Sequence, residues 1–288
     1  MTGALLLDKP AGSTSHDLVA RARRALGTRT VGHTGTLDPF ATGLLVLLVG
    51  RATRLARFVE QQDKTYLAVA TLGTATTTDD VTGEPTGAGT DGRGDREPAR
   101  AEVEAALGSF RGAQRQRPST YSAKHLDGER AYARARRGEV VELAEVPIVV
   151  HALELVRYAY PEVEFRATVS PGTYVRALAR DLGERLGTGA HLTALRREAI
   201  GGLRVEQAVP PAAVTPASLL PPLAVLEHLP RIPVSEAEAT ALGFGKAVPR
   251  HEAAAAPVLA VAPGNRLIAV GRLAGGAFHP EVVLEAAS

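Results

Sequence analysis

The chain of 288 residues contains no cysteine, no tryptophan, a single methionine and only 4% aromatic residues. Without cysteine it can form neither disulfides nor thiolate metal sites, and no cysteine can serve as a nucleophile. The longest uninterrupted apolar run, residues 44–49, is far shorter than the ~20 residues that span a bilayer. Catalysis, if there is any, must therefore use Asp, Tyr, Ser, Thr, Lys or Arg side chains.

The eight histidines show no H-x-x-x-H pair or related ligand spacing, which argues against a metal site. The N-terminus lacks a basic segment, and its apolar stretch is too short for a signal peptide. Hydrophobic residues make up 45% and charged residues 22%, a balance typical of a globular protein with a core. We therefore expect no metal, no cofactor and no membrane segment, and we predict a cytoplasmic protein.

Basic residues are clustered, although the formal net charge is only +2. Residues 111–137 hold eight Lys and Arg against two acidic residues, a local net charge of +6. Smaller arginine clusters lie at 21–24, 51–57 and 196–197. Any one cluster can be a solvated helix face. Several together favour a polyanionic partner, because each phosphate contact releases counterions.

Local patterns predict a mixture of helices and strands. Thr14 and Asp17 form a capping-box pattern for a helix that ends at Gly27. Within residues 111–137 we expect a loop that leads into a helix. Strands and helices do not alternate in a βαβ rhythm, so we predict an α+β fold. Further predicted elements are a short helix at 53–60, a strand at 64–73, a half-buried strand at 163–170 and a helix at 175–186.

The composition changes towards the C-terminus. Residues 209–233 are rich in proline, which indicates a linker on the surface. The last 55 or so residues hold short apolar runs between turns and predict a small β domain. We assign no function to the glycine-rich loop at 82–100. The predicted domains are 1–230, with a basic insertion at about 111–137, and 231–288.

The stretch GHTGTLDPFATG, residues 32–43, contains one carboxylate, Asp38, between glycine-containing turns and next to Pro39. The turns and the proline leave this side chain little freedom, and we expect it to contact little water. It is either an Asx turn that caps its own backbone or a positioned nucleophile or base. The stretch lacks G-K-[ST], which excludes a nucleotide P-loop.

Arg176 stands at the start of a predicted helix, where the helix dipole disfavours a cation. Asp38 as a partner would explain this position, and the arginine would lower the pKa of the carboxyl group by ~1–3 units. The alternative is a solvent-facing arginine paired with Asp181 or Glu184. Tyr66 is either a half-buried strand residue or a surface for stacking a base. These residues alone do not identify a reaction.

Five segments resemble the bacterial tRNA pseudouridine-55 synthases, in the same order, between residue 4 and about residue 205. GHTGTLDP is the most specific block within them. The tail after about residue 231 resembles a PUA-like RNA-binding domain. The resemblance implies a pseudouridine synthase fold, with a mixed, largely antiparallel sheet flanked by helices and loops. The matching segments are LLLDKPAGSTSHD, RTVGHTGTLDPFATGLLVLLVGRATR, DKTYLAVATLGTATTTDDVTG, RPSTYSAKHLDGERAYARARRGE and SPGTYVRALARDLGERLGTGAHLTALRR.

The resemblance also implies an activity: cofactor-free isomerisation of uridine 55 in the T loop of tRNA, after the base has flipped out. It implies tRNA as the partner, and we expect a monomer without a protein partner. By the same resemblance the catalytic residues are Asp38, Tyr66 and Arg176. The implied substrate-binding residues are His33, Tyr66, Asp80, Tyr174 and Leu195. The residues expected to bind the RNA backbone are Arg115, Lys124, Arg130, Arg134 and Arg137.

Other interpretations stay open at this point. One is a non-catalytic RNA-binding protein or tRNA chaperone that uses the same basic faces. Another is a related synthase that acts on ribosomal RNA. A carboxylate hydrolase would need a second acid, which residues 32–43 do not provide. Whether Asp38 attacks the sugar, attacks the base or removes a proton also stays open.

Overall fold

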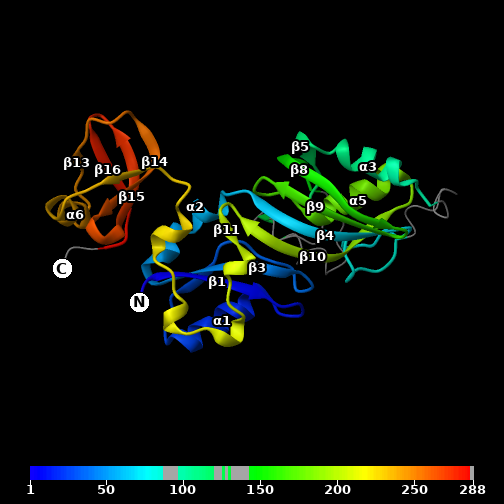
Figure 1. Cartoon of the computed structure of the whole chain (residues 1–288), viewed down its shortest axis with the longest axis horizontal. Helices are drawn as coiled ribbons and strands as arrows, with labels where there is room; N and C mark the ends of the chain where they lie inside the picture. Colours follow the sequence, from blue (N-terminus) through cyan, green and yellow to red (C-terminus); the bar gives the residue numbers. More distant parts are fainter. Residues whose placement is uncertain (87–96, 120–124, 127–128, 131–142, 286–288) are drawn as a thin grey trace.

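The fold is built around one nine-stranded mixed sheet (Figure 1). The computed structural model describes residues 1–86, 97–119, 125–126, 129–130 and 143–285. The strands run in the order β1-β3-β10-β4-β9-β8-β5, with β2 beside β3 and β11 beside β10. Within this sheet only the β10–β3 pair is parallel, which confirms the predicted α+β fold with a largely antiparallel sheet. The strands are β1 (Gly3–Lys9), β2 (Val31–His33), β3 (Thr42–Val49), β4 (Lys64–Leu72), β5 (Gly112–Gln116), β8 (Val146–Ala159), β9 (Glu162–Val169), β10 (Ala190–Ile200) and β11 (Leu203–Arg204).

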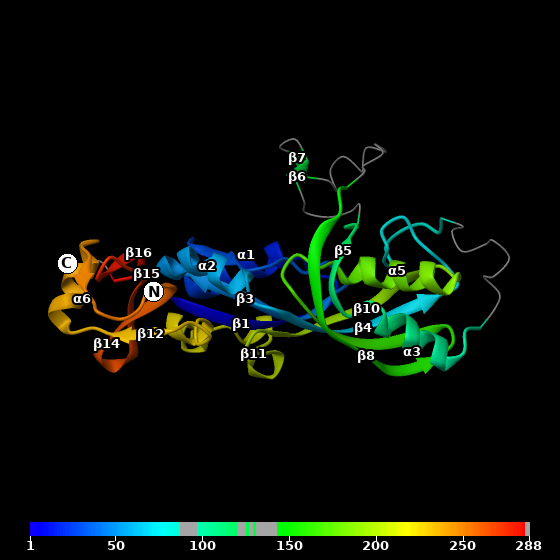
Figure 2. The same ribbon diagram turned by 90° about the horizontal axis from the view of Figure 1, so that it is seen from above.

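Two helices cover the sheet where β4, β8, β9 and β10 lie side by side (Figure 2). They are α3 (Arg100–Gly108) and α5 (Val175–Leu186), which also contact each other. On α5 the residues at helical spacing, among them Leu178 and Leu182, enter a core with the inner residues of β4 and β9. Those strands alternate between buried and partly exposed positions, as strands with one covered face do. Helix α5 is thereby fixed on the sheet, and its first turn lies at the cavity described below.

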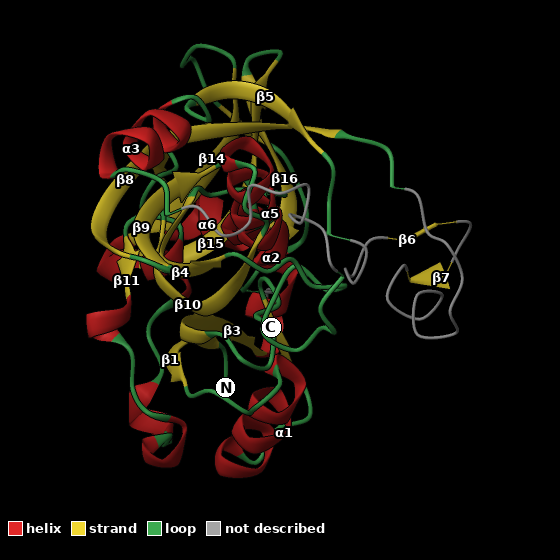
Figure 3. Cartoon of the chain, turned by 90° about the vertical axis from the view of Figure 1, so that its right-hand side faces the viewer, coloured by secondary structure: helices red, strands yellow, loops and turns green. Residues whose placement is uncertain are grey.

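Strands β1 and β3 are buried on both faces, which explains their continuous runs of leucine and valine. One face packs against α1 (Ser15–Leu26), through residues such as Leu45 and Leu18. The other face packs against the segment after β3 and against the C-terminal part of the chain, through residues such as Leu44. Seen from the end, α1 and β5 lie at opposite sides of the molecule (Figure 3).

The C-terminal residues form a second, five-stranded sheet in the order β12-β14-β15-β16-β13. A short helix, α6 (Glu236–Gly243), begins at a Ser235 capping box; the sequence analysis did not predict it. The proline-rich segment precedes this sheet in the sequence and runs alongside β1, where Leu220 N donates to Ala4 O at 2.8 Å. The five strands are β12 (Arg231–Pro233), β13 (Val248–Pro249), β14 (Ala255–Ala262), β15 (Arg266–Ala274) and β16 (Ala277–Val283).

The tail domain, residues 231–285, shares a hydrophobic core with the large sheet. Leu259 and Leu284 of the tail belong to the same buried cluster as Phe58 and Leu44. Above this core, the arginines at 51–57 contact the tail: Arg51 Nη1 donates to Leu284 O, Arg54 Nη1 to Val283 O, and Arg57 pairs with Glu281. Three of the basic residues that suggested an RNA-binding face therefore also hold the two parts of the chain together.

Most predicted elements are confirmed. Thr14 caps α1 with Asp17, and Gly27 ends the helix in the left-handed conformation, with φ 61°. At 53–60 a 3₁₀ helix (Gly50–Leu55) runs into α2 (Ala56–Glu60). The expected loop leading into a helix at 111–137 is tested only in part, because residues 120–124, 127–128 and 131–142 lie outside the described residues. Gly112–Gln116 form the edge strand β5, and His125–Leu126 pairs with Glu129–Arg130 as β6 and β7. Among the described residues, no helix is long and apolar enough to cross a membrane.

Candidate active site

The loop between β2 and β3 carries Asp38 and is held from three directions. The ammonium group of Lys9, which is fully buried, donates to Pro39 O at 3.2 Å and Ala41 O at 2.6 Å. Ser15 Oγ accepts from Leu37 N at 3.0 Å, so the first turn of α1 holds the residue before Asp38. Charged and polar side chains thus satisfy the backbone of a loop that has little regular structure of its own.

Arg197 supports the same loop from β10. Its side chain is 2% exposed; Nε donates to Leu44 O at 2.7 Å and Nη2 to Gly35 O at 3.1 Å. Close to it, Gly43 has φ +100°, and a Cβ there would lie 2.3 Å from Arg197 O. The glycine after FAT is therefore required for the close approach of β3 and β10.

The predicted contact between Asp38 and Arg176 is confirmed. Arg176 Nε lies 3.1 Å from Asp38 Oδ2, and Arg176 Nη1 lies 3.1 Å from Asp80 Oδ2. Nη1 also donates to Thr78 O at 3.0 Å. The alternative pairing is wrong, because Asp181 pairs instead with the arginine one turn further along α5, at 2.7 Å. Two carboxylates and a carbonyl thus explain a cation at the start of a helix.

Asp80 is buried and held in a network of its own. Its Oδ1 accepts from Thr78 Oγ1 at 2.7 Å and from Thr82 N at 2.9 Å, while Oδ2 faces Arg176. The neighbouring Asp79, with φ 59°, points to Arg180 Nη1 at 3.1 Å. The two adjacent acids therefore have separate partners one helical turn apart on α5.

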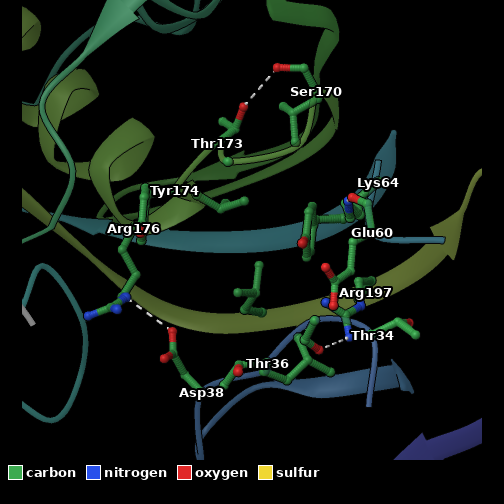
Figure 4. A pocket seen from close by; sticks show the side chains of 17 residues that line it. Thr34, Thr36, Asp38, Glu60, Lys64, Ser170, Thr173, Tyr174, Arg176 and Arg197 are labelled. Carbon is green, nitrogen blue, oxygen red and sulfur yellow. Dashed lines mark hydrogen bonds and ion pairs between the residues drawn. The ribbon is translucent and has the colours of Figure 1, made fainter. Parts of the chain in front are cut away.

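Asp38, Arg176 and Arg197 line a cavity of about 360 Å³, within the range of small-ligand sites, whereas Asp80 is not among its lining residues (Figure 4). Asp38 and Arg176 stand at one end, and Lys64, Glu60 and Arg197 stand at the other. The cavity is lined by residues 34–38, Glu60, Lys64, Tyr66, Val169, Ser170, residues 172–176, Leu195 and Arg197. Of the sequence-predicted residues, the fold brings Asp38, Tyr66, Tyr174, Arg176 and Leu195 together here.

The sequence-based expectation for the pKa of Asp38 is wrong in direction. Burial raises the pKa of this carboxyl group, the nearby charge of Asp80 raises it further, and the Arg176 and Lys9 cations only partly oppose this. The Asp38 side chain is also 34% exposed, more than its turn-rich setting led us to expect. Desolvation disfavours the ionised form of Asp38 more than the arginine favours it. The carboxylate is therefore a stronger proton acceptor than an aspartate in water.

His33 lies beside the cavity and is not among its lining residues. It ends β2, and its ring meets the His16 ring edge-on, with the centroids 5.7 Å apart. Burial, followed by the charges of His16 and Arg197, lowers the pKa of His33. The imidazole is therefore kept neutral near physiological pH, which suits a contact with a base more than one with a phosphate.

Of the residues expected to bind the RNA backbone, only Arg115 has a described side chain, and it pairs with Glu145 at 3.1 Å. Arg130 belongs to β7. Lys124, Arg134 and Arg137 lie outside the described residues.

Both segments that form this site match known protein families. Residues 23–175 match the family model described as TruB family pseudouridylate synthase, N-terminal domain. The chain belongs to the TruB family. Residues 176–220 match the model of the tRNA pseudouridylate synthase B C-terminal domain. In this TruB family member the two matched segments meet at the cavity, because Asp38 comes from the first and Arg176 from the second.

Relatives of the TruB family match over nearly the whole chain. The tRNA pseudouridine synthase B of Synechococcus sp. (strain WH7803) is 43% identical over 302 residues, 99% of this chain and 98% of its own. That of Thermobifida fusca (strain YX) is 42% identical, covering 98% of both chains. Among solved structures, a chain of an H/ACA RNP bound to a substrate RNA containing 2′-deoxyuridine has a TM-score of 0.74 at 22% identity, covering 98% of this chain and 84% of its own. That last likeness supports the fold.

Four buried side chains that hold or line the site of this TruB family member were not predicted from the sequence. Lys9 and Arg197 hold the Asp38 loop, and Lys64 lines the far end of the cavity. Gln116 is the fourth: its amide exchanges hydrogen bonds with Tyr174, accepting from Tyr174 N at 2.9 Å and donating to Tyr174 O at 3.1 Å. The lysines and the arginine lay inside the matched motifs, but nothing in their spacing distinguished them from surface cations.

Proposed function

We propose that this protein converts uridine 55 in the T loop of tRNA to pseudouridine, with Asp38 as the catalytic residue. The observation that supports this most directly is the position of Asp38. Its carboxylate opens into a cavity of about 360 Å³ and is held against a buried arginine, with Tyr66 in the same lining. Relatives named tRNA pseudouridine synthase B, such as that of Arthrobacter sp. (strain FB24) at 42% identity, support the substrate class.

The reaction breaks the N1–C1′ bond of uridine, turns the base and joins C5 to C1′; C5 loses its proton and N1 gains one, so the product is an isomer of the substrate. For this the base must leave its stack, which costs a few kcal/mol and less in a loop than in a duplex. Stacking on Tyr66 would recover ~1–3 kcal/mol of that cost. Asp38 then acts as a nucleophile on the sugar or base, or as a base on a sugar proton, while Arg176 and Asp80 keep its carboxylate in place.

We assign RNA binding to the part of the chain with the highest density of positive charge. The basic insertion at about 111–137 would contact the T-stem phosphates, with recognition resting mainly on loop shape. His33 would contact the target base or its neighbour, and Leu195 and Tyr174 would contact the flipped nucleotide. We further propose that the tail is a PUA-like RNA-binding domain, and that the protein works as a cytoplasmic monomer without a protein partner or a cofactor.

The decisive test is Asp38→Asn, which keeps the shape of the side chain and removes its ability to accept a proton or attack carbon. Pseudouridine formation on unmodified tRNA should fall by at least about 10³-fold, while tRNA affinity stays within about tenfold. Glu227→Gln, at an exposed acid outside the cavity lining, is the control. Unchanged turnover in Asp38→Asn would refute the proposed role.

Substrate choice is tested separately. Purified protein is incubated with T-loop minihelices and with ribosomal RNA fragments, and pseudouridine is mapped in both. We expect modification of the minihelix at the T-loop uridine. Preference for the ribosomal fragments would favour the related rRNA synthase, and tRNA binding without any modification would favour the chaperone.

A further inference from the structure

Two buried cations stand at the end of the cavity away from Asp38. Lys64 and Arg197 both line the cavity, and their residues are 9% and 2% exposed. Lys64 Nζ donates to the backbone carbonyls of Glu60 and Gln62, and Arg197 donates to those of Leu44 and Gly35. Among the described residues, neither cation forms an ion pair. Glu60 lines the same end of the cavity (Figure 4), and its charge and that of Asp63 act on Lys64 without forming an ion pair with it.

The register of the strands places these cations beside Tyr66. Lys64 and Tyr66 are two positions apart on β4, so their side chains share one face and lie ~7 Å apart along the strand. Arg197 on β10 is the register partner of Tyr66. A nucleotide whose base stacks on Tyr66 would lie between Asp38 and these cations, and a phosphate of the adjoining backbone would then point towards them. The close-up shows Lys64 and Arg197 on that side (Figure 4).

The donor chemistry of this end is suited to an anion. An ammonium group has three N–H donors, and the two carbonyls occupy two of those of Lys64, which leaves one for a ligand. The other charged groups nearby are Glu60, which is exposed at the cavity, and Asp63, which pairs with His151 at 3.2 Å. Glu60 and Asp63 offset part of the cost of burying the Lys64 charge, and a bound anion would offset more of it.

We propose that Lys64 and Arg197 form a phosphodiester subsite, which binds a backbone phosphate adjacent to the nucleotide that stacks on Tyr66. Lys64 donates the hydrogen bond to the phosphate, and Arg197 supplies positive charge from the neighbouring strand. This inference rests on the proposed function, because the position of the base defines which phosphate is meant. It explains why two buried cations line one end of the cavity without forming an ion pair with any described residue.

The contribution of Lys64 to RNA affinity should depend on pH. Burial and the charge of Arg197 lower the pKa of Lys64 to about 8, with Asp63 and Glu60 opposing the shift. A bound phosphate would favour the charged ammonium and raise that pKa again. The contribution of the subsite to RNA affinity should therefore be present below pH 8 and decline as the pH rises above it.

The test is a charge-deletion cycle between protein and RNA. T-loop minihelices are made with a single neutral methylphosphonate at each position flanking the target uridine, and dissociation constants are measured at pH 7 for the wild type and for Lys64→Met. We expect one position to weaken wild-type binding at least about tenfold, the size of a charge-assisted hydrogen bond, and to weaken Lys64→Met binding by less than about twofold. Lys246→Met, an exposed lysine of the tail, is the matched control and should retain the wild-type penalty.

Equal methylphosphonate penalties in wild type and Lys64→Met at every position would overturn the subsite. If Lys64→Met does not fold, the wild-type scan decides alone, since the absence of any penalty near the target uridine contradicts the proposal. Repeating the wild-type scan at pH 9 gives a second readout, in which the penalty at the sensitive position should shrink. Pseudouridine formation by the wild type on the unmodified minihelix tests the proposed function separately from the subsite.

Discussion

The cavity at Asp38 and the tail domain each contain an arginine–carboxylate pair, yet the pKa of the carboxyl group shifts in opposite directions. In the tail, Arg250 and Ser235 donate hydrogen bonds to Glu238 and lower its pKa to about 2. In the cavity Asp38 also faces an arginine, but burial and Asp80 raise its pKa. A neighbouring cation gives a carboxyl group a lowered pKa only where its attraction outweighs the desolvation of the carboxylate.

The opposite pKa shifts distinguish a structural pair, Glu238 with Arg250, from the proposed catalytic pair, Asp38 with Arg176. The side chains of Glu238 and Asp38 are similarly exposed, at 31% and 34%, but the hydrogen bonds that Glu238 accepts from Arg250 and Ser235 outweigh its desolvation, whereas at Asp38 desolvation is the larger effect. The cavity pair has lost part of its hydration, so the carboxylate keeps its charge at a cost and becomes more basic. The fold holds Asp38 through Lys9, Ser15 and Arg197, which bond to its loop and not to its carboxylate. This arrangement fixes the acid in space without neutralising it.

The largest effect on stability should come from breaking the buried network at Asp80. Asp80→Asn removes a buried negative charge that lies 3.1 Å from the buried Arg176 guanidinium. We expect the free energy of unfolding to fall by about 3 kcal/mol, measured by urea denaturation. A loss below about 0.5 kcal/mol would mean that Arg176 is well solvated in this network.

The next prediction concerns the acid limb of the pH–rate profile. If ionised Asp38 is required, single-turnover pseudouridine formation falls as the pH drops below its pKa, and this limb lies above the normal range of an aspartate. Removing the positive charge in Arg176→Met disfavours the carboxylate, so the limb should move up by about one pH unit. Removing a negative charge in Asp80→Asn should move it down. Shifts of the same sign in both variants would contradict the electrostatic explanation.

The smallest effect is expected in the tail. Glu238→Gln removes a charge from a partly exposed pair and should lower the free energy of unfolding at pH 7 by about 1 kcal/mol. Because the folded-state pKa of Glu238 is depressed, its contribution is fully present above pH 4.5 and is lost as the pH falls towards about 2. The difference between wild type and variant in urea midpoints, measured from pH 7 to pH 3, should therefore shrink at the acidic end. Turnover at pH 7 should not change.

Local patterns in the sequence predicted the elements whose causes are local. The capping box at Thr14 and the helix end at Gly27 depend on neighbouring residues, and both are confirmed. The unusual position of Arg176 at a helix start also pointed to a carboxylate partner, which the structure supplies. In contrast, β5 was missed because the residues GAQRQ, at an exposed sheet edge, have no apolar alternation to reveal a strand.

What the sequence could not show depends on contacts between distant segments. Lys9 reaches the carbonyl of Ala41, and Arg197 reaches that of Leu44, 153 positions away. Nothing near either residue predicts burial, since lysine and arginine are usually exposed. The raised pKa of Asp38 has the same origin. The partner could be inferred from the sequence, but the extent of desolvation depends on how the whole cavity closes around the acid.

The two covered faces of β1 have a consequence for synthesis on the ribosome. This strand is translated long before the residues that cover it, because Ala4 binds Leu220 and the same side of the sheet packs against leucines as late as Leu284. Until those residues have been translated, one apolar side of β1 and β3 therefore remains exposed. The nascent chain should depend on holding factors until then, and premature termination within the tail should leave an aggregation-prone product.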